Sequence, residues 1–192
     1  MMAVISVENK ISIRMASIFE EVRMRLYQKG EALKRKDADY CSIQAGKDED
    51  IDTFPTFVRS AMNEIDQTVV KRMYTFDWSI GPIVDQSSSD ADANPNESSD
   101  SVSNAGEEYL VIEYIPYQRF KIEDEARMRR IVSKNIYDYV VSFVMAEWLK
   151  TVAPDLARDM VSDTDVLLFR VMKAFASLSP TVRRRATNLA GI

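Results

Sequence analysis

Apolar side chains recur at helical spacing over an unusually wide face of residues Asp124–Lys150. They form two neighbouring rows, which are Val132, Ile136, Val140, Val144 and Trp148, and Tyr137, Val141, Met145 and Leu149. The polar edge of this helix is narrow, running from Arg127 through Arg130, Lys134 and Asp138 and fading to Ser142. A helix with so little polar surface must be covered by other elements. The pattern therefore predicts a central helix around which the rest of the chain is packed.

An amphipathic helix is predicted near the N-terminus, from about Glu8 into the 30s. Its apolar positions recur at steps of three and four residues and are Ile11, Met15, Ile18, Phe19, Val22 and Leu26. Gly30 leaves two readings open. The helix either ends there, with Gly30 in the left-handed cap conformation, or continues at a cost of about 1 kcal/mol relative to alanine.

A second helix has a clear start signal, because Asp52 or Thr53 can cap it and Pro55 stands near the first helical position. The apolar spacing that follows predicts that it continues to about Tyr74.

Beyond the central helix, Pro154 is expected to end the helical run, since proline cannot continue a helix. Residues Pro154–Met160 are predicted to form a short helical turn. A last helix is then expected, capped by Ser162 or Asp163 and stopped by Ser179 and Pro180.

Two β-prone stretches, Ser79–Val84 and Tyr109–Ile115, predict the strands of a β-hairpin that spans residues 76–116. Between them, Asp85–Glu108 is rich in serine and asparagine and carries seven acidic and no basic side chains. Such a segment buries too little apolar surface to offset the entropy of ordering it, so a long flexible loop at 85–108 is predicted. It is either a tolerated solvated insertion or a loop that orders against a partner.

The order of these elements predicts a mainly α fold, a bundle of about four helices with a small β-hairpin insertion that carries the acidic loop. Residues 1–180 are expected to form one helical domain and residues 181–192 a basic C-terminal arm. A chain of 192 residues is long enough to bury a core without disulfides.

Composition adds a few expectations about location. The net charge is −5, and there is a single cysteine, Cys41, so no disulfide forms within the chain. No signal peptide is recognisable, and no apolar run approaches the roughly 18 residues that a membrane span needs. We therefore expect a soluble protein from a reducing compartment that makes no membrane contact.

Candidate chemistry is sparse. The chain has no histidine, which removes the commonest general base and the commonest metal ligand. No phosphate-binding glycine motif, zinc-protease motif or CxxC pair occurs. The acidic clusters Asp48–Asp52 and Glu123–Glu125 are interpreted as solvated or helix-capping groups. We therefore expect no enzyme, cofactor or metal site.

The C-terminal arm holds the most basic stretch, Arg183, Arg184 and Arg185. Three readings stay open for the arm: it contacts nucleic-acid phosphates, together with Arg127, Arg129 and Arg130, it docks on a neighbouring protein, or it is a disordered end.

The stretch Arg130–Ala157, RIVSKNIYDYVVSFVMAEWLKTVAPDLA, resembles the small helical head–tail connector proteins of tailed bacteriophages. Those proteins are also called head-completion or adaptor proteins, and the likeness is to the crAss-like kind. It rests on a mostly apolar helix that ends in EWLK before a Pro-Asp turn, and on the order of elements over about half of the chain.

The resemblance implies a structural virion protein without catalysis, which forms a ring at the neck between head and tail and lines the DNA channel. About twelve copies would match the portal, since a closed ring needs a matching symmetry. Implied partners are further copies of the chain, the portal protein and other neck or tail proteins, with non-specific contact to passing DNA. The implied location is the virion neck, and the host cytoplasm during assembly.

Two sets of partner-binding residues are expected on this reading. In the arm they are Arg183, Arg184, Arg185, Leu189 and Ile192, and in the hairpin they are Ile80, Ile83, Tyr109 and Val111. Both predicted strands are expected to offer edges to neighbouring subunits. The alternatives are a tail-completion protein, a cytosolic helical adaptor or regulatory protein, and a small DNA-packaging accessory.

Overall fold

The computed structural model describes residues 9–34, 53–69, 73–82, 107–116 and 122–177. In chain order their elements are β1 (Asn9–Arg14), α1 (Met15–Lys34), α3 (Phe54–Val69), β2 (Met73–Gly81), β3 (Tyr109–Pro116), α4 (Ile122–Val152) and α5 (Pro154–Ser177). The fold is mainly helical with a small antiparallel sheet, as the sequence predicts.

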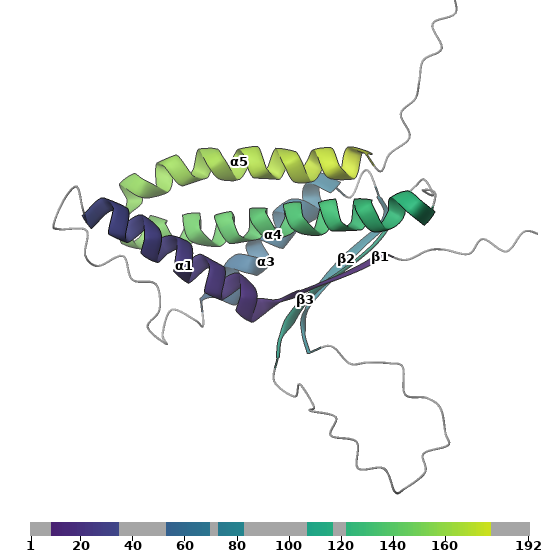
Figure 1. The fold of residues 1–192 in the computed structure, drawn as a ribbon, viewed down its shortest axis with the longest axis horizontal. Helices are drawn as coiled ribbons and strands as arrows, with labels where there is room; N and C mark the ends of the chain where they lie inside the picture. Colours follow the sequence, from purple (N-terminus) through teal and green to yellow (C-terminus); the bar gives the residue numbers. More distant parts are fainter. Residues whose placement is uncertain (1–8, 35–52, 70–72, 83–106, 117–121, 178–192) are drawn as a thin grey trace, which may run out of the picture.

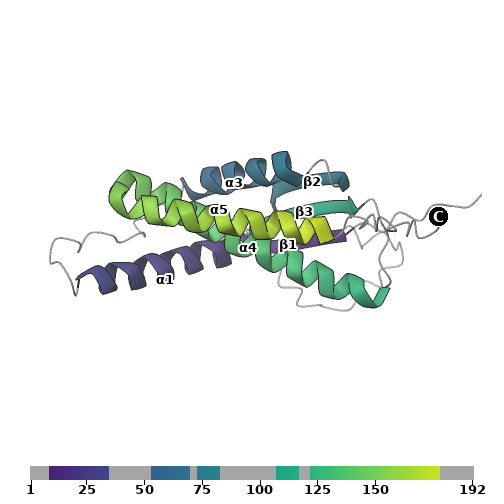
Figure 2. The ribbon, with the colours of Figure 1, turned by 90° about the horizontal axis from the view of Figure 1, so that it is seen from above.

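Helix α4 is the centre of the packing, with α1, α3 and α5 all in contact with it (Figures 1 and 2). Both predicted apolar rows are buried except Tyr137, which is partly buried. The prediction of a central, mostly covered helix is confirmed. No helix in the described ranges combines the length and apolar character needed to cross a membrane.

The sheet has three strands in the order β1-β3-β2, and both pairings are antiparallel. Ile11 pairs with Ile112 and Ile13 with Leu110, and all four side chains are buried. The end of α5 packs on the same face of the sheet, because the Phe175 ring meets the rings of Phe76 and Tyr114 edge-on, at centroid distances of 5.8 and 5.6 Å.

The prediction of a helix from Glu8 is wrong, because Asn9–Arg14 forms strand β1 and the helix begins at Met15. The segment alternates strictly between buried and exposed side chains, which is the period of a strand. Pairing with β3 decides the conformation of a stretch whose isoleucines also fit helical spacing. Helix α1 continues past Gly30 to Lys34, so the second of the two readings for Gly30 is the correct one.

The second helix begins as predicted. The carbonyl of Thr53 accepts the backbone N–H groups of Thr56 and Phe57 at 3.1 and 3.3 Å, which places Thr53 at the cap. Its predicted end at Tyr74 is wrong, because α3 ends at Val69 and β2 already begins at Met73. Pairing with β3 again overrides the helical spacing.

Pro154 separates α4 from α5 as predicted, with the N–H of Ala153 donating to the carbonyl of Leu149 at 2.7 Å. The predicted cap at Ser162 or Asp163 is wrong, because α5 runs unbroken from Pro154 to Ser177. Its first half is held on α4 by a buried contact of 3.2 Å between the hydroxyls of Ser142 and Thr164.

Tyr139 links two of the helices. Its side chain is fully buried, and its hydroxyl on α4 donates to Oε2 of Glu64 on α3 at 2.8 Å. Burial raises the pKa of Tyr139 above its ordinary value, and the hydrogen bond to Glu64 raises it further. A tyrosine in the unfolded chain ionises near pH 10. The buried, neutral hydroxyl of Tyr139 therefore makes its full contribution to stability below pH 10, and this contribution is lost as the pH rises above 10.

We therefore expect wild type to lose stability between pH 9 and pH 11.5 more steeply than Tyr139→Phe. At pH 8 the substitution itself should cost about 0.5–1.5 kcal/mol, the usual contribution of one hydrogen bond. Urea midpoints across the pH series measure both effects, with Tyr27→Phe as control because Tyr27 is 57% exposed. Equal slopes for wild type and Tyr139→Phe would contradict the role given to Tyr139.

Candidate functional site

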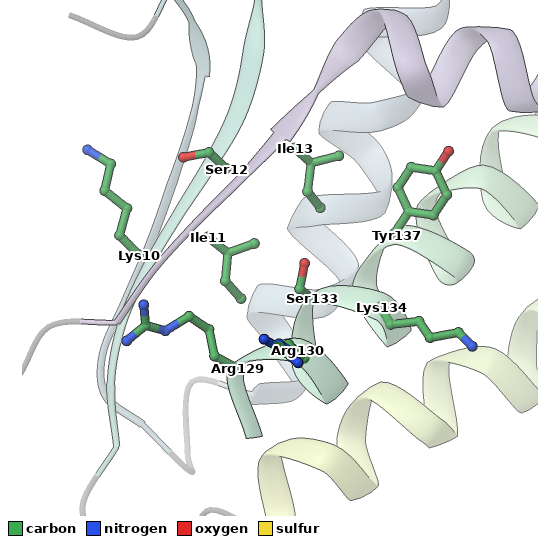
Figure 3. A pocket seen from close by; sticks show the side chains of 9 residues that line it. All are labelled: Lys10, Ile11, Ser12, Ile13, Arg129, Arg130, Ser133, Lys134 and Tyr137. Atoms are coloured by element: carbon green, nitrogen blue, oxygen red, sulfur yellow. The ribbon is translucent and has the colours of Figure 1, made fainter. Parts of the chain in front are cut away.

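A groove of about 440 Å³ lies between β1 and the first half of α4 (Figure 3). We call it the β1–α4 groove, and its lining residues are Lys10, Ile11, Ser12, Ile13, Arg129, Arg130, Ser133, Lys134 and Tyr137. The fold thus brings together two segments that are more than a hundred positions apart in the chain.

The groove follows one edge of β1. Successive side chains of a strand point to opposite faces, yet residues of both orientations line it. Figure 3 shows Ile11 and Ile13 on the side of β1 that faces α4, whereas Lys10 and Ser12 lie on the other side. One edge of β1 is paired with β3. Within the described residues no strand pairs with the other edge, which is the one beside the groove.

The α4 wall comes from one face of the helix. Arg129, Ser133 and Tyr137 are spaced by four residues, as are Arg130 and Lys134, so they form two adjacent rows. This wall contains part of the narrow polar edge that the sequence shows on the central helix. That edge is therefore the part of α4 that borders the groove.

Four basic side chains give the groove a positive rim. Nζ of Lys10 lies 3.2 Å from Oε1 of Glu113 on β3, an exposed pair that binds weakly in water. Nη2 of Arg129 donates to Oδ1 of the buried Asn9 at 3.4 Å, which holds the start of β1 against α4. Arg130 and Lys134 also line the groove, and both are exposed.

Tyr137 closes one end of the groove. Its hydroxyl donates to the backbone carbonyl of Ser17 at 3.1 Å and so joins α4 to α1. Burial raises the pKa of Tyr137, and nearby Glu21 adds to the effect. The hydroxyl therefore stays protonated and keeps its role as donor at neutral pH.

This arrangement can bind an anionic ligand. It offers cationic heads, serine hydroxyls and the unpaired backbone edge of a strand. No group of three or more cysteine, aspartate or glutamate side chains that could hold a metal ion occurs in the described part of the chain.

The structure separates the hairpin residues that the sequence singles out. Tyr109 and Val111 lie on β3, which is the central strand, so the expectation that this strand offers a free edge is wrong. Their side chains are half-buried on the face opposite the buried one, whereas Ile80 on β2 is partly buried against the core. Ile83 lies outside the described residues. Partner binding by these four residues stays a prediction.

The basic arm at 181–192 lies outside the described residues, as do Cys41, Asp48–Asp52 and residues 85–106. Glu107 and Glu108, the last two residues of the predicted acidic loop, are described. A carboxylate oxygen of Glu107 pairs with Arg14 and another accepts the hydroxyl of Tyr109 at 2.8 Å, while the carbonyl of Glu108 accepts the N–H of Met15 at 2.9 Å.

Reasoning from the sequence missed the β1 half of the groove, because Lys10 and Ser12 fell inside a predicted helix. The signal that could have found them is the alternation of polar and apolar residues in NKISIR, which is the period of a half-buried strand. Arg129 and Arg130 were recognised as potential phosphate contacts, but nothing in the sequence placed them beside β1.

Comparisons of this chain with protein-family models, with curated proteins and with solved structures found no match.

Proposed function

We propose that this chain is a non-catalytic structural subunit that assembles with copies of itself into a closed ring at the neck of a tailed bacteriophage. The ring would join the portal to the tail and surround the DNA channel. The resemblance of Arg130–Ala157 to head–tail connectors suggests this function, and one feature of the fold supports the assembly.

That feature is a sheet with two different outer edges. β1 and β2 are the outer strands of the order β1-β3-β2, and no further strand of the described residues pairs with either. A ring requires a heterologous contact, in which one surface of a subunit meets a different surface of the next. Unpaired strand edges at opposite sides of a sheet are a liability in a monomer and an asset in such an assembly.

Exposed apolar side chains on two of the helices also support the proposed assembly. Met24 and Tyr27 on α1 are 48% and 57% exposed, and Val166 and Phe169 on α5 are 51% and 64% exposed. Each pair is spaced by three residues and so lies on one helix face. These patches suit burial between subunits.

The full chain should therefore form one closed species whose mass is a fixed multiple of 21.9 kDa, about twelvefold to match a portal. Native mass spectrometry of the chain at micromolar concentration measures this multiple. Mass spectrometry of purified phage particles should find about one copy of the chain per portal subunit. A monomer, or an open series of masses without a preferred size, would contradict the ring. Absence from particles would contradict the location.

A second function, a small accessory that binds nucleic acid, is favoured by the cationic rim of the β1–α4 groove. This second function would be supported if the chain stays monomeric and binds duplex DNA with an affinity that falls steeply as the salt concentration rises.

A further inference from the structure

We infer that the β1–α4 groove binds the acidic segment of a second copy of this chain, which adds as an extended strand along the outer edge of β1. The acidic segment is defined here as residues 85–106. The inference rests on the proposed function, because it names the two surfaces that meet between neighbours in the ring.

Charge complementarity is the first argument. The acidic segment has no lysine or arginine, and its carboxylates are Asp85, Asp90, Asp92, Glu97 and Asp100. The groove has four basic side chains and, among its lining residues, no acidic one. Lys10 already has a partner in Glu113 and Arg129 in Asn9, so Arg130 and Lys134 are the cations best placed to receive carboxylates.

The unpaired outer edge of β1 is the second argument. No strand of the described residues pairs with this edge, and the hydroxyls of Ser12 and Ser133 are among the polar groups that line the groove beside it. The accessible lining of the groove is otherwise mainly apolar, so its polar contacts lie along the strand edge and at the cationic rim. Strand addition uses main-chain hydrogen bonds and needs no apolar side chains on the ligand, so a chain rich in serine and asparagine can add to this edge and direct its carboxylates to the rim.

The proposed ring favours a second copy as the donor. The segment follows Gly81 on the outer strand β2, and the residue after it, Glu107, pairs with Arg14 at the end of β1. The segment and the groove are different parts of one subunit, and a heterologous contact joins two different surfaces of neighbouring subunits. The segment of one subunit in the groove of the next meets this requirement.

Two full-length variants test this contact. The first, Arg130→Glu with Lys134→Glu, reverses the charge of two side chains on the rim and leaves the hydrogen bond between Arg129 and Asn9 in place. The second neutralises the acidic segment through Asp90→Asn, Asp92→Asn, Glu97→Gln and Asp100→Asn. Each variant alone should fail to assemble through this contact. Mixed in equal amounts they should form a heterodimer, since the first still carries an intact segment and the second an intact groove.

The heterodimer should be salt-sensitive, with a dissociation constant that rises about tenfold or more between 50 and 500 mM salt. Light scattering and native mass spectrometry measure both the species and the constant. A matched control, Arg59→Glu with Arg158→Glu, makes the same change in net charge at exposed positions on α3 and α5 and should assemble like wild type.

Several outcomes would overturn the inference. Variants that both assemble like wild type would show that the groove and the segment do not meet. Monomeric variants whose mixture stays monomeric would place the contact within one chain. A different result would assign the groove to nucleic-acid phosphates: wild type binds duplex DNA, the Arg130→Glu and Lys134→Glu variant binds it more weakly, and the mixture of variants forms no heterodimer.

Failure of this inference and failure of the ring are separable. Rings formed by the rim-reversed variant alone would leave the ring standing and remove the groove from it. A heterodimer from the mixture, combined with a wild type that forms only open chains, would keep the groove contact and remove the closed ring.

Discussion

Replacing Ile136 by aspartate is expected to destabilise the fold by more than about 4 kcal/mol at pH 7, which is a large part of the stability of a typical domain. Ile136 is fully buried on α4, at the centre of the packing between the helices. An ionised carboxylate placed there loses its hydration. Because burial raises the folded-state pKa of such a carboxyl, the deficit should grow as the pH rises above the unfolded value, by up to about 1.4 kcal/mol per unit.

Thermal melting and far-ultraviolet circular dichroism at pH 5.5 and pH 7.5 measure the deficit. Ile131→Asp is the matched control, since Ile131 lies on the same helix and is 38% exposed, so its aspartate can stay hydrated. Ile136→Asn separates polarity from charge, because its deficit should not change over this pH range. A stable, pH-independent Ile136→Asp protein would contradict the central position of α4 in the core.

Replacing Phe175 by alanine is expected to lower the free energy of unfolding by about 3–5 kcal/mol, the range for truncating a buried aromatic side chain. The Phe175 ring is fully buried and meets Phe76 and Tyr114 edge-on, so its removal leaves a cavity between α5 and the sheet. It also removes two aromatic contacts, each adding about 0.5–1.5 kcal/mol beyond area burial.

Chemical denaturation measures this effect, and Val161→Ala on the same helix is its control. The Val161 side chain is 38% exposed and lies outside the Val166 and Phe169 patch, so its truncation should change stability by no more than about 0.5 kcal/mol. Similar losses for the two variants would mean that α5 does not pack on the sheet through Phe175.

The packing of α5 on the sheet also bears on the proposed ring. Helix α4 forms one wall of the β1–α4 groove and packs against α5, while α5 holds the sheet through Phe175. The groove and the β2 edge are therefore parts of one packed unit. In the proposed ring, two surfaces on one packed unit would keep a constant angle to each other, which ring closure requires.

The helices were largely readable from the sequence, because a 3.6-residue apolar period over many residues is a strong local signal. The rows Val132–Trp148 and Tyr137–Leu149 predicted α4 and its covering, and Pro154 predicted the break before α5. Boundaries were less secure. The ends near Tyr74 and Ser162 were misjudged because a weak local preference there gives way to pairing or packing.

The sequence alone determined that this chain is a mainly α protein with a central apolar helix and an acidic segment between two paired strands. Only the tertiary structure decided that Asn9–Arg14 is a third strand and that β3 is the central one. Strand order and the β1–α4 groove depend on contacts between residues far apart in the chain. Local periodicity carries no information on such contacts, since the pairing partner of a strand is chosen by burial in the assembled fold.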